Sequence, residues 1–193
     1  MPFAPSNDPI PAGFQAGPYL LEPIGPWLAE PDLEAVMASR ELLRRWSASS
    51  WPEDDFSLEA NASDLAEHAD DHAKRVAFGY SVREVGTGRV FGSVYVNPVR
   101  SWLERWTVDD GARARLKGWR TAVDWWFRAD EVERWPAFFD TLNAWMESAW
   151  PGPVLYGSRP AMVDLRAIYL TRGLVEIAVI TSPGGTVQHL HGR

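Results

Sequence analysis

Hydrophobic and polar positions along the chain change their period several times, and each change marks a different kind of element. Between residues 33 and 46 apolar side chains recur every three or four residues, after Pro31 and Asp32, which are favoured in the first turn of a helix. From residue 76 to 96 the period is that of strands, around a turn at residues 86–88, as in an antiparallel hairpin. Similar patterns predict strands at 19–24, 121–128, 154–157, 175–180 and 186–190, and helices at 57–76, 136–150 and 162–171. The predicted order is β-α-α-β-β-β-α-β-α-β-β.

The length and this pattern together indicate one domain. A chain of 193 residues can bury a sizeable core in a single domain, and the succession of elements predicts an α/β fold. Residues 1–17 are rich in proline and glycine and show little periodicity, so we expect an extended N-terminal arm there. We therefore place the domain at residues 18–193.

Composition and charge limit the cellular location and the kinds of partner to be expected for this chain. The sequence is 46% hydrophobic, and no apolar run approaches the roughly 20 residues of a membrane span. It has no cysteine, and its first ten residues lack the basic start and apolar stretch of a signal peptide, so we expect a soluble cytoplasmic protein. The net charge of −7 disfavours nucleic acid, and the basic segment from Arg100 to Arg120 is interleaved with acids, as on a solvated helix face. We expect neither a nucleic acid nor a membrane as partner.

Eleven tryptophans are many for a chain of this length. They follow no fixed period, which argues against a repeat architecture and against a stacking platform for single-stranded nucleic acid. We expect most of them to be packing residues, with Trp125 and Trp126 on a strand buried on both faces and Trp145 on the helix that covers it. The aromatic content and the N-terminal arm together make a homodimer plausible.

Four stretches between residues 18 and 181 resemble, in matching order, parts of the acyl-CoA N-acyltransferase (GNAT) superfamily. The first two are LLEPIGPWLAEPDLEAVMAS (20–39), similar to the opening strand and helix, and AFGYSVREVGTGRVFGSVYVNP (77–98), similar to the family hairpin. TAVDWWFRADEV (121–132) resembles the central strand that carries acetyl-CoA, and AIYLTRGLVEI (167–177) resembles the segment before the last hairpin. The resemblance implies a mixed, mostly antiparallel, twisted sheet flanked by helices on both faces.

The resemblance also implies an activity, the transfer of an acyl group, in particular acetyl, from acetyl-CoA to a small amine or amino-containing metabolite. The amine would attack the thioester directly, without a covalent enzyme intermediate. Backbone groups of Trp126, Phe127 and Arg128 would bind the pantetheine amides, and the start of the next helix would meet the pyrophosphate. Tyr169 occupies the position of a general acid that protonates the coenzyme A thiolate.

Two departures from the family pattern leave a second hypothesis open. The acidic residue that commonly begins the central strand is Ala122 here, so Asp124 is the candidate base. The glycine-rich loop of the family is replaced by DEVERWPA (130–137), which has three acids, no glycine, and only Arg134 with the charge that binds phosphate. The alternative is a catalytically degenerate GNAT-fold protein that binds a ligand or partner without acyl transfer.

Other chemistry has little support in the sequence. His68 and His72 share a helix face but have no evident third ligand, so a polar helix surface is favoured over a metal site. His189 and His191, near the chain end, are expected to be exposed to solvent. The sequence contains no Ser-His-acid order, phosphate-binding P-loop or dinucleotide fingerprint.

Overall fold

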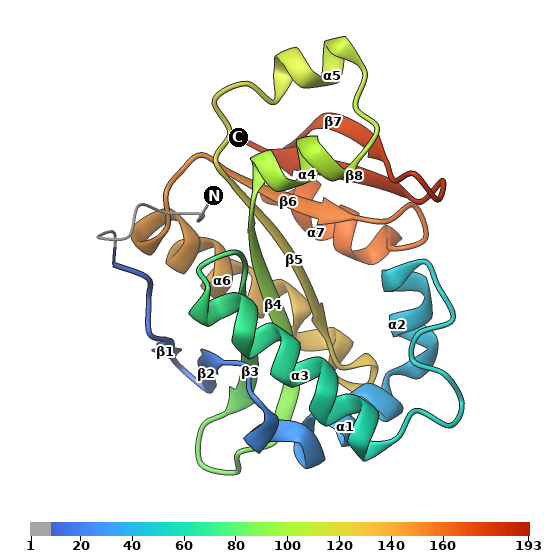
Figure 1. The fold of residues 1–193 in the computed structure, drawn as a ribbon. Helices are drawn as coiled ribbons and strands as arrows, with labels where there is room; N and C mark the ends of the chain where they lie inside the picture. The colour runs from blue at the N-terminus through green and yellow to red at the C-terminus, as the bar shows by residue number, and fades with distance from the viewer. Residues whose placement is uncertain (1–8) are drawn as a thin grey trace.

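The computed structural model describes residues 9–193, apart from the side chain of Trp102, and these residues form an open eight-stranded sheet (Figure 1). The strands are β1 (Phe14–Ala16), β2 (Tyr19–Pro23), β3 (Phe78–Glu84), β4 (Val90–Pro98), β5 (Thr121–Phe127), β6 (Val154–Ser158), β7 (Val175–Thr181) and β8 (Val187–Gly192). Their order in the sheet is β1-β2-β3-β4-β5-β6-β8-β7, and each neighbouring pair is antiparallel except β5 and β6. The expected mixed, mostly antiparallel sheet is confirmed.

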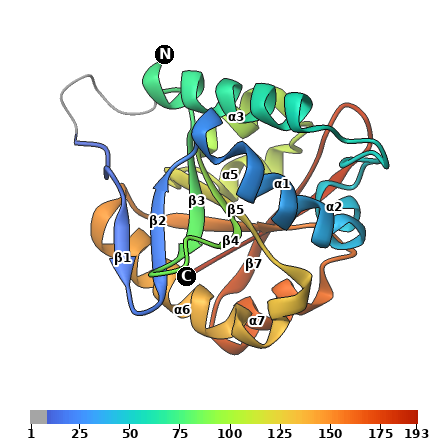
Figure 2. The same cartoon turned by 90° about the horizontal axis from the view of Figure 1, so that it is seen from below.

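Helices cover both faces of this sheet (Figure 2). One face carries α1 (Ala29–Ala38), α3 (Leu58–Ala73), α4 (Val99–Arg105) and α5 (Asp110–Arg115), and the other carries α6 (Trp135–Ala149) and α7 (Val163–Thr171). The helix α2 (Arg40–Ser47) follows α1, and the short 3-10 helices η1 (Pro26–Leu28) and η2 (Ala129–Arg134) precede α1 and α6. Within residues 9–193, each helix is too short or too polar to cross a lipid bilayer.

The core beneath α6 is mainly aromatic. Phe138 and Trp145 of α6 are 0% and 3% exposed, and the ring of Phe138 meets that of Trp125 on β5 at 5.3 Å, edge to face. Trp126 points to the opposite face, where it packs with Val36 of α1. The central strand is therefore buried on both faces, and the predicted core positions of Trp125, Trp126 and Trp145 are confirmed.

The stretch 33–46, expected to be one helix, is divided between α1 and α2. The interruption is at Ser39, which is 2% exposed and whose hydroxyl accepts a hydrogen bond from the N–H of Ala129 at 3.2 Å. This contact joins residues 90 positions apart, so the local hydrophobic period does not reveal it.

The hydrophobic pattern also fails to predict α4 and α5, between β4 and β5. Both are short, and a capping side chain rather than a long apolar stripe starts α5, where Asp109 accepts a hydrogen bond from the N–H of Ala112 at 2.8 Å. Ala112 and Leu116 pack on Ala122 of β5. The segment thus covers one end of the sheet.

The N-terminal arm packs against the body of the same chain from residue 11 onward. Phe14–Ala16, within the stretch expected to be an extended arm, pairs with β2, and the ring of Phe14 stacks on that of Trp145 at 5.5 Å. The hydroxyl of Tyr80 donates to the carbonyl of Pro11 at 2.6 Å. The part of the predicted arm from residue 1 to 8 lies outside the described residues.

Candidate functional site

The parallel strands β5 and β6 pair only over their first three residues and then diverge (Figure 1). Residues 121–123 lie opposite residues 154–156, and the next residue on each strand is Asp124 on β5 and Gly157 on β6. We call the space between the diverging strands the gap, and Asp124 and Gly157 its vertex. Backbone groups that face such a gap can pair with an added peptide-like ligand where no side chain already occupies them.

The backbone of β5 that faces the gap belongs to Trp125 and Phe127. The N–H of Arg128 donates to the carbonyl of Phe91, near the start of β4, at 2.6 Å. The alternation of an antiparallel ladder then directs the backbone of Trp126 toward β4 as well. Of the three residues expected to bind pantetheine through their backbone, Phe127 therefore faces the gap, whereas Trp126 and Arg128 face the neighbouring strand.

Trp46 of α2 lies beside the gap, on the face of the sheet that α1 and α3 cover. Its indole N–H donates to the carbonyl of Trp125 at 2.7 Å, and its ring lies 5.8 Å from the ring of Tyr95. The Trp125 carbonyl, which faces the gap, is therefore already hydrogen-bonded to a side chain of α2.

The loop after β5 is filled with ion pairs. Asp130 accepts hydrogen bonds from Arg128 at 2.9 Å and from Arg89 at 3.0 Å. Glu131 pairs with Arg89 and, at 3.0 Å, with Arg134, which was the expected phosphate ligand. The hydrogen bond from Arg128 holds the pKa of Asp130 below its usual value. This loop is therefore a 3-10 segment closed by its own charges rather than an open run of backbone amides.

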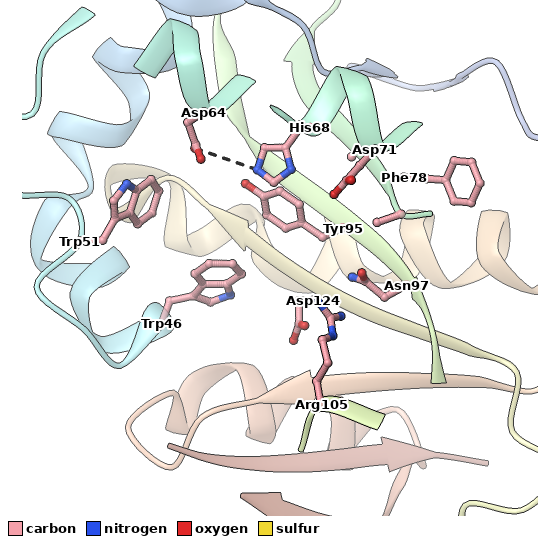
Figure 3. A pocket seen from close by; sticks show the side chains of 12 residues that line it. Trp46, Trp51, Asp64, His68, Asp71, Phe78, Tyr95, Asn97, Arg105 and Asp124 are labelled. Carbon is pink, nitrogen blue, oxygen red and sulfur yellow. Dashed lines mark ion pairs between the residues drawn. The ribbon is translucent and has the colours of Figure 1, made fainter. Parts of the chain in front are cut away.

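A cavity of about 420 Å³ lies on the other side of Trp46, between α2, α3 and the strands β3 to β5 (Figure 3). Its aromatic wall is formed by Trp46, Trp51 and Tyr95. Acidic side chains enter it from two elements, Asp64 and Asp71 from α3 and Asp124 from β5. Figure 3 shows the two α3 acids on one side of Tyr95 and Asp124 on the other.

Asp124, the candidate base, lies where the gap meets the cavity. Its Oδ1 accepts a hydrogen bond from Nε2 of Gln188 on β8 at 2.6 Å. Both side chains lie over Gly157, where an added Cβ would come within 1.9 Å of Gln188 Nε2 and 2.3 Å of Asp124 Oδ1, so any larger residue at this position would require these two side chains to move. Burial raises the pKa of Asp124, and the charge of Arg159 partly opposes the effect. A carboxylate with a raised pKa is the stronger proton acceptor.

Tyr169, the candidate general acid, reaches the same vertex from α7. The side chain is 0% exposed, and its hydroxyl donates to the carbonyl of Gly157 at 3.1 Å. Burial raises the pKa of Tyr169 well above its usual value, so the hydroxyl keeps its proton at neutral pH. The structure therefore brings Asp124 and Tyr169 to one residue of β6, although the catalytic role of each stays a prediction.

Two residues beside the vertex were not found from the sequence, Gln188 and Arg159. Burial lowers the pKa of Arg159, whose guanidinium lies 5.2 Å from the centre of the Trp106 ring. Within the described residues, Nε and Nη1 of Arg159 and Oε1 of Gln188 have no hydrogen-bond partner. Buried polar atoms without partners are uncommon in folded proteins, and they favour a place where a ligand supplies polar groups. The register of β6 and β8 places Gln188 beside Asp124, so no local motif signals this cluster.

The histidines differ from expectation. His68 lines the cavity with its ring 5.0 Å from Tyr95, and the ring of His72 lies 5.0 Å from Phe78, so the expected polar helix surface is wrong. His191 is 0% exposed, so the expectation of solvent exposure is wrong there too. In the part of the chain that the structure describes, three His, Asp or Glu side chains nowhere gather closely enough to hold a metal ion.

Comparison with known proteins gives a likeness in structure only. No protein-family model matches the sequence, and no curated protein matches it significantly. The ribosomal-protein-S5-alanine acetyltransferase of Vibrio fischeri is 14% identical, with a TM-score of 0.64 over 94% of this chain and 95% of that one. The microcin C7 self-immunity acetyltransferase MccE, solved with acetyl-CoA and AMP, is 12% identical, with a TM-score of 0.65 over 95% of this chain and 97% of that one.

A third similar structure is a GNAT-family acetyltransferase from Bacillus anthracis, which is 11% identical, with a TM-score of 0.57 over 94% of this chain and 97% of that one. These matches span nearly the whole of each chain. The chain therefore has the GNAT fold, the fold of the acyl-CoA N-acyltransferases.

Proposed function

We propose that this chain is an acyl-CoA-dependent N-acyltransferase, in particular an N-acetyltransferase, that acts on a small amine. The observation that carries the proposal is Asp124, a carboxylate of raised pKa at the point where the gap meets an acid-lined cavity. The amine would lie in the cavity and the acyl thioester in the gap. Acetyltransferases of the same fold, one of them solved with acetyl-CoA, support this interpretation.

Residues of this chain would serve the two proton transfers of such a reaction. When bound, acetyl-CoA supplies the activated acyl group. Asp124 would accept a proton from the amine, because burial makes its carboxylate a stronger base. Tyr169 would donate a proton to the departing thiolate after its hydroxyl turns away from the carbonyl of Gly157.

The two halves of the expected acetyl-CoA site fit the ligand unequally. The backbone of Phe127 faces the gap, and Trp125 becomes a second partner for pantetheine amides once the indole of Trp46 moves aside. The loop around η2 fits a pyrophosphate poorly, because Asp130 and Glu131 are there and their arginine partners are already engaged. We therefore expect weaker binding than an open glycine-rich loop provides.

Release of free thiol from acetyl-CoA, measured across a panel of amines, tests the activity. Asp124→Asn should lower kcat by roughly 10²–10⁴-fold, the usual contribution of a general base. Asp110→Asn, an exposed acid in the first turn of α5, is the matched control and should leave kcat unchanged. If no amine in a broad panel is acetylated and acetyl-CoA does not raise the melting temperature, the proposal fails.

Two observations favour a second candidate function, a GNAT-fold protein that binds an amine or a partner without acyl transfer. The loop closed by ion pairs and the Trp46 hydrogen bond both restrict the acetyl-CoA site while leaving the cavity intact. A ligand at 100 times its dissociation constant stabilises its protein by about 2.7 kcal/mol. Melting curves with acetyl-CoA and with amines therefore separate the two functions, because the second predicts stabilisation by amines alone.

We further propose a cytoplasmic homodimer, on the sequence features described above. The homodimer is tested by light scattering of the purified protein, and a monomer at every concentration would refute it.

A further inference from the structure

The carboxylates of the cavity stand in two separate groups. Asp64 and Asp71 lie seven residues apart on α3, which is about 10 Å along a helix axis, and both line the cavity. Asp124 lies beyond Tyr95 on β5 (Figure 3). Among the described residues that line the cavity, Arg105 is the single guanidinium, and it is exposed. A ligand with one positive charge would neutralise only one of the two groups.

The wall between the two groups is aromatic. The rings of Trp46 and Tyr95 are 5.8 Å apart, and the ring of His68 lies 5.0 Å from that of Tyr95 on the α3 side. Such a wall can pack against methylene groups, and its ring faces attract organic cations. The surface therefore suits an aliphatic chain that carries positive charge at intervals.

The electrostatics of the two groups differ. Near Asp124 the cation Arg159 already lies close enough to shift the pKa of the carboxyl, so a second positive charge there is disfavoured and a neutral amine is favoured. On α3, Asp64 has His68 as its nearest basic side chain, at 4.0 Å, and burial raises the pKa of Asp64. An ammonium group is thus better placed beside α3, and a neutral, nucleophilic amine beside Asp124.

We propose that the cavity binds a linear aliphatic diamine or polyamine, whose distal positive charge lies on the α3 side and is attracted by the carboxylates of Asp64 and Asp71, while the amine to be acylated lies at Asp124. This inference deepens the proposed function and rests on it only for the acylated end. The amine that reacts is neutral, and the distal charge supplies affinity without entering the chemistry. Monoamines and neutral diols of equal length lack that second anchor.

Binding is tested without acetyl-CoA, by calorimetry with spermidine, putrescine, butylamine and 1,4-butanediol. We expect spermidine and putrescine to bind more tightly than butylamine, and butanediol not to bind. In the double variant Asp64→Asn/Asp71→Asn the affinity for spermidine should fall by roughly ten- to hundredfold, as expected for the loss of charged hydrogen bonds, while that for butylamine changes little. The double variant Glu59→Gln/Glu67→Gln removes the same charge from exposed positions of α3 and should bind spermidine nearly as the wild type does.

Two results would overturn the inference: butylamine binding as tightly as spermidine, or equal losses of spermidine affinity in the two double variants. Melting curves of each variant confirm that it is folded. If spermidine binds as expected but acetyl-CoA yields no acetylated product, the proposed transferase activity fails and the polyamine site stands. If another amine is acetylated while spermidine does not bind, the activity stands and the polyamine site fails.

Discussion

Asp32 should reduce the stability of the protein at neutral pH, and its replacement by asparagine should restore that stability. The carboxyl lies in the first turn of α1, is 4% exposed, and has its pKa raised from 3.8 to about 6, mainly by burial. A hydrogen bond with Asn61 opposes this rise, and the charge of Asp64 adds to it. At 1.36 kcal/mol for each pH unit, the difference between 3.8 and about 6 corresponds to about 3 kcal/mol.

The sign of the effect follows from proton binding. Between pH 3.8 and 6 the folded protein keeps the proton of Asp32 while the unfolded chain releases it, so the free energy of unfolding falls as the pH rises through this window. Asp32→Asn has no such proton. The variant should therefore be about 3 kcal/mol more stable than the wild type above pH 6.5, and the difference should vanish near pH 3.5.

Urea unfolding of both proteins at intervals between pH 3.5 and 7.5 measures this difference directly. At neutral pH the melting temperature of the variant should be higher by roughly 6–12 °C, given about 2–4 °C for each kcal/mol in a chain of this size. Asp110→Asn controls for a general change of charge on an exposed helix start. A variant that is less stable at every pH, or a difference that does not depend on pH, would show that burial of the Asp32 charge is not the controlling effect. Asp32 feels the charge of Asp64, which lines the cavity, and a cost in stability next to a binding residue is expected where the residue serves function.

Three further predictions test the site and the fold. Calorimetry should give a dissociation constant for acetyl-CoA weaker than about 1 μM, equivalent to −8.2 kcal/mol, because Glu131 and its neighbours close the loop; tighter binding would contradict this account of the loop. Trp145→Ala should lower the free energy of unfolding by about 3–5 kcal/mol in urea titrations, since the ring is 3% exposed, and an unchanged stability would count against the packing of α6. Tyr169→Phe keeps the ring but removes its proton, so kcat should fall roughly 10²–10⁴-fold with little change in KM if the hydroxyl is the general acid; wild-type turnover would remove Tyr169 from the mechanism.

Elements with a strong local period were predictable from the sequence. The hairpin of β3 and β4 and the buried strand β5 appear where strand-like apolar runs and turn residues place them. The break at Ser39 was not predictable, because a hydrogen bond from Ala129, distant in the sequence, stabilises it. Local patterns record which face of an element is buried, but they do not record which distant backbone atom meets a polar side chain.

The residues of the candidate site were likewise predictable from the sequence only in part. The absence of glycine after β5 and the two candidate catalytic residues Asp124 and Tyr169 were visible in the sequence through their order along the chain. Gln188 was not, because it reaches Asp124 only through the antiparallel pairing of β6 with β8, and Arg159, which directly follows β6, belongs to no recognisable local motif. The expectation that Trp126 and Arg128 face a ligand was one residue out of phase, since the side of a strand that faces a neighbour depends on the register of the ladder.

Trp46 contacts both the cavity and the gap, so it can couple ligand binding at one to ligand binding at the other. Its ring is part of the cavity wall, and its N–H is bonded to the carbonyl of Trp125 that faces the gap. A molecule that pairs with this carbonyl must displace the indole, and the displaced ring changes the wall offered to a molecule in the cavity. Affinities at the two places are then linked, and linkage is reciprocal: whatever factor an occupant of the cavity imposes on binding in the gap, an occupant of the gap imposes on the cavity.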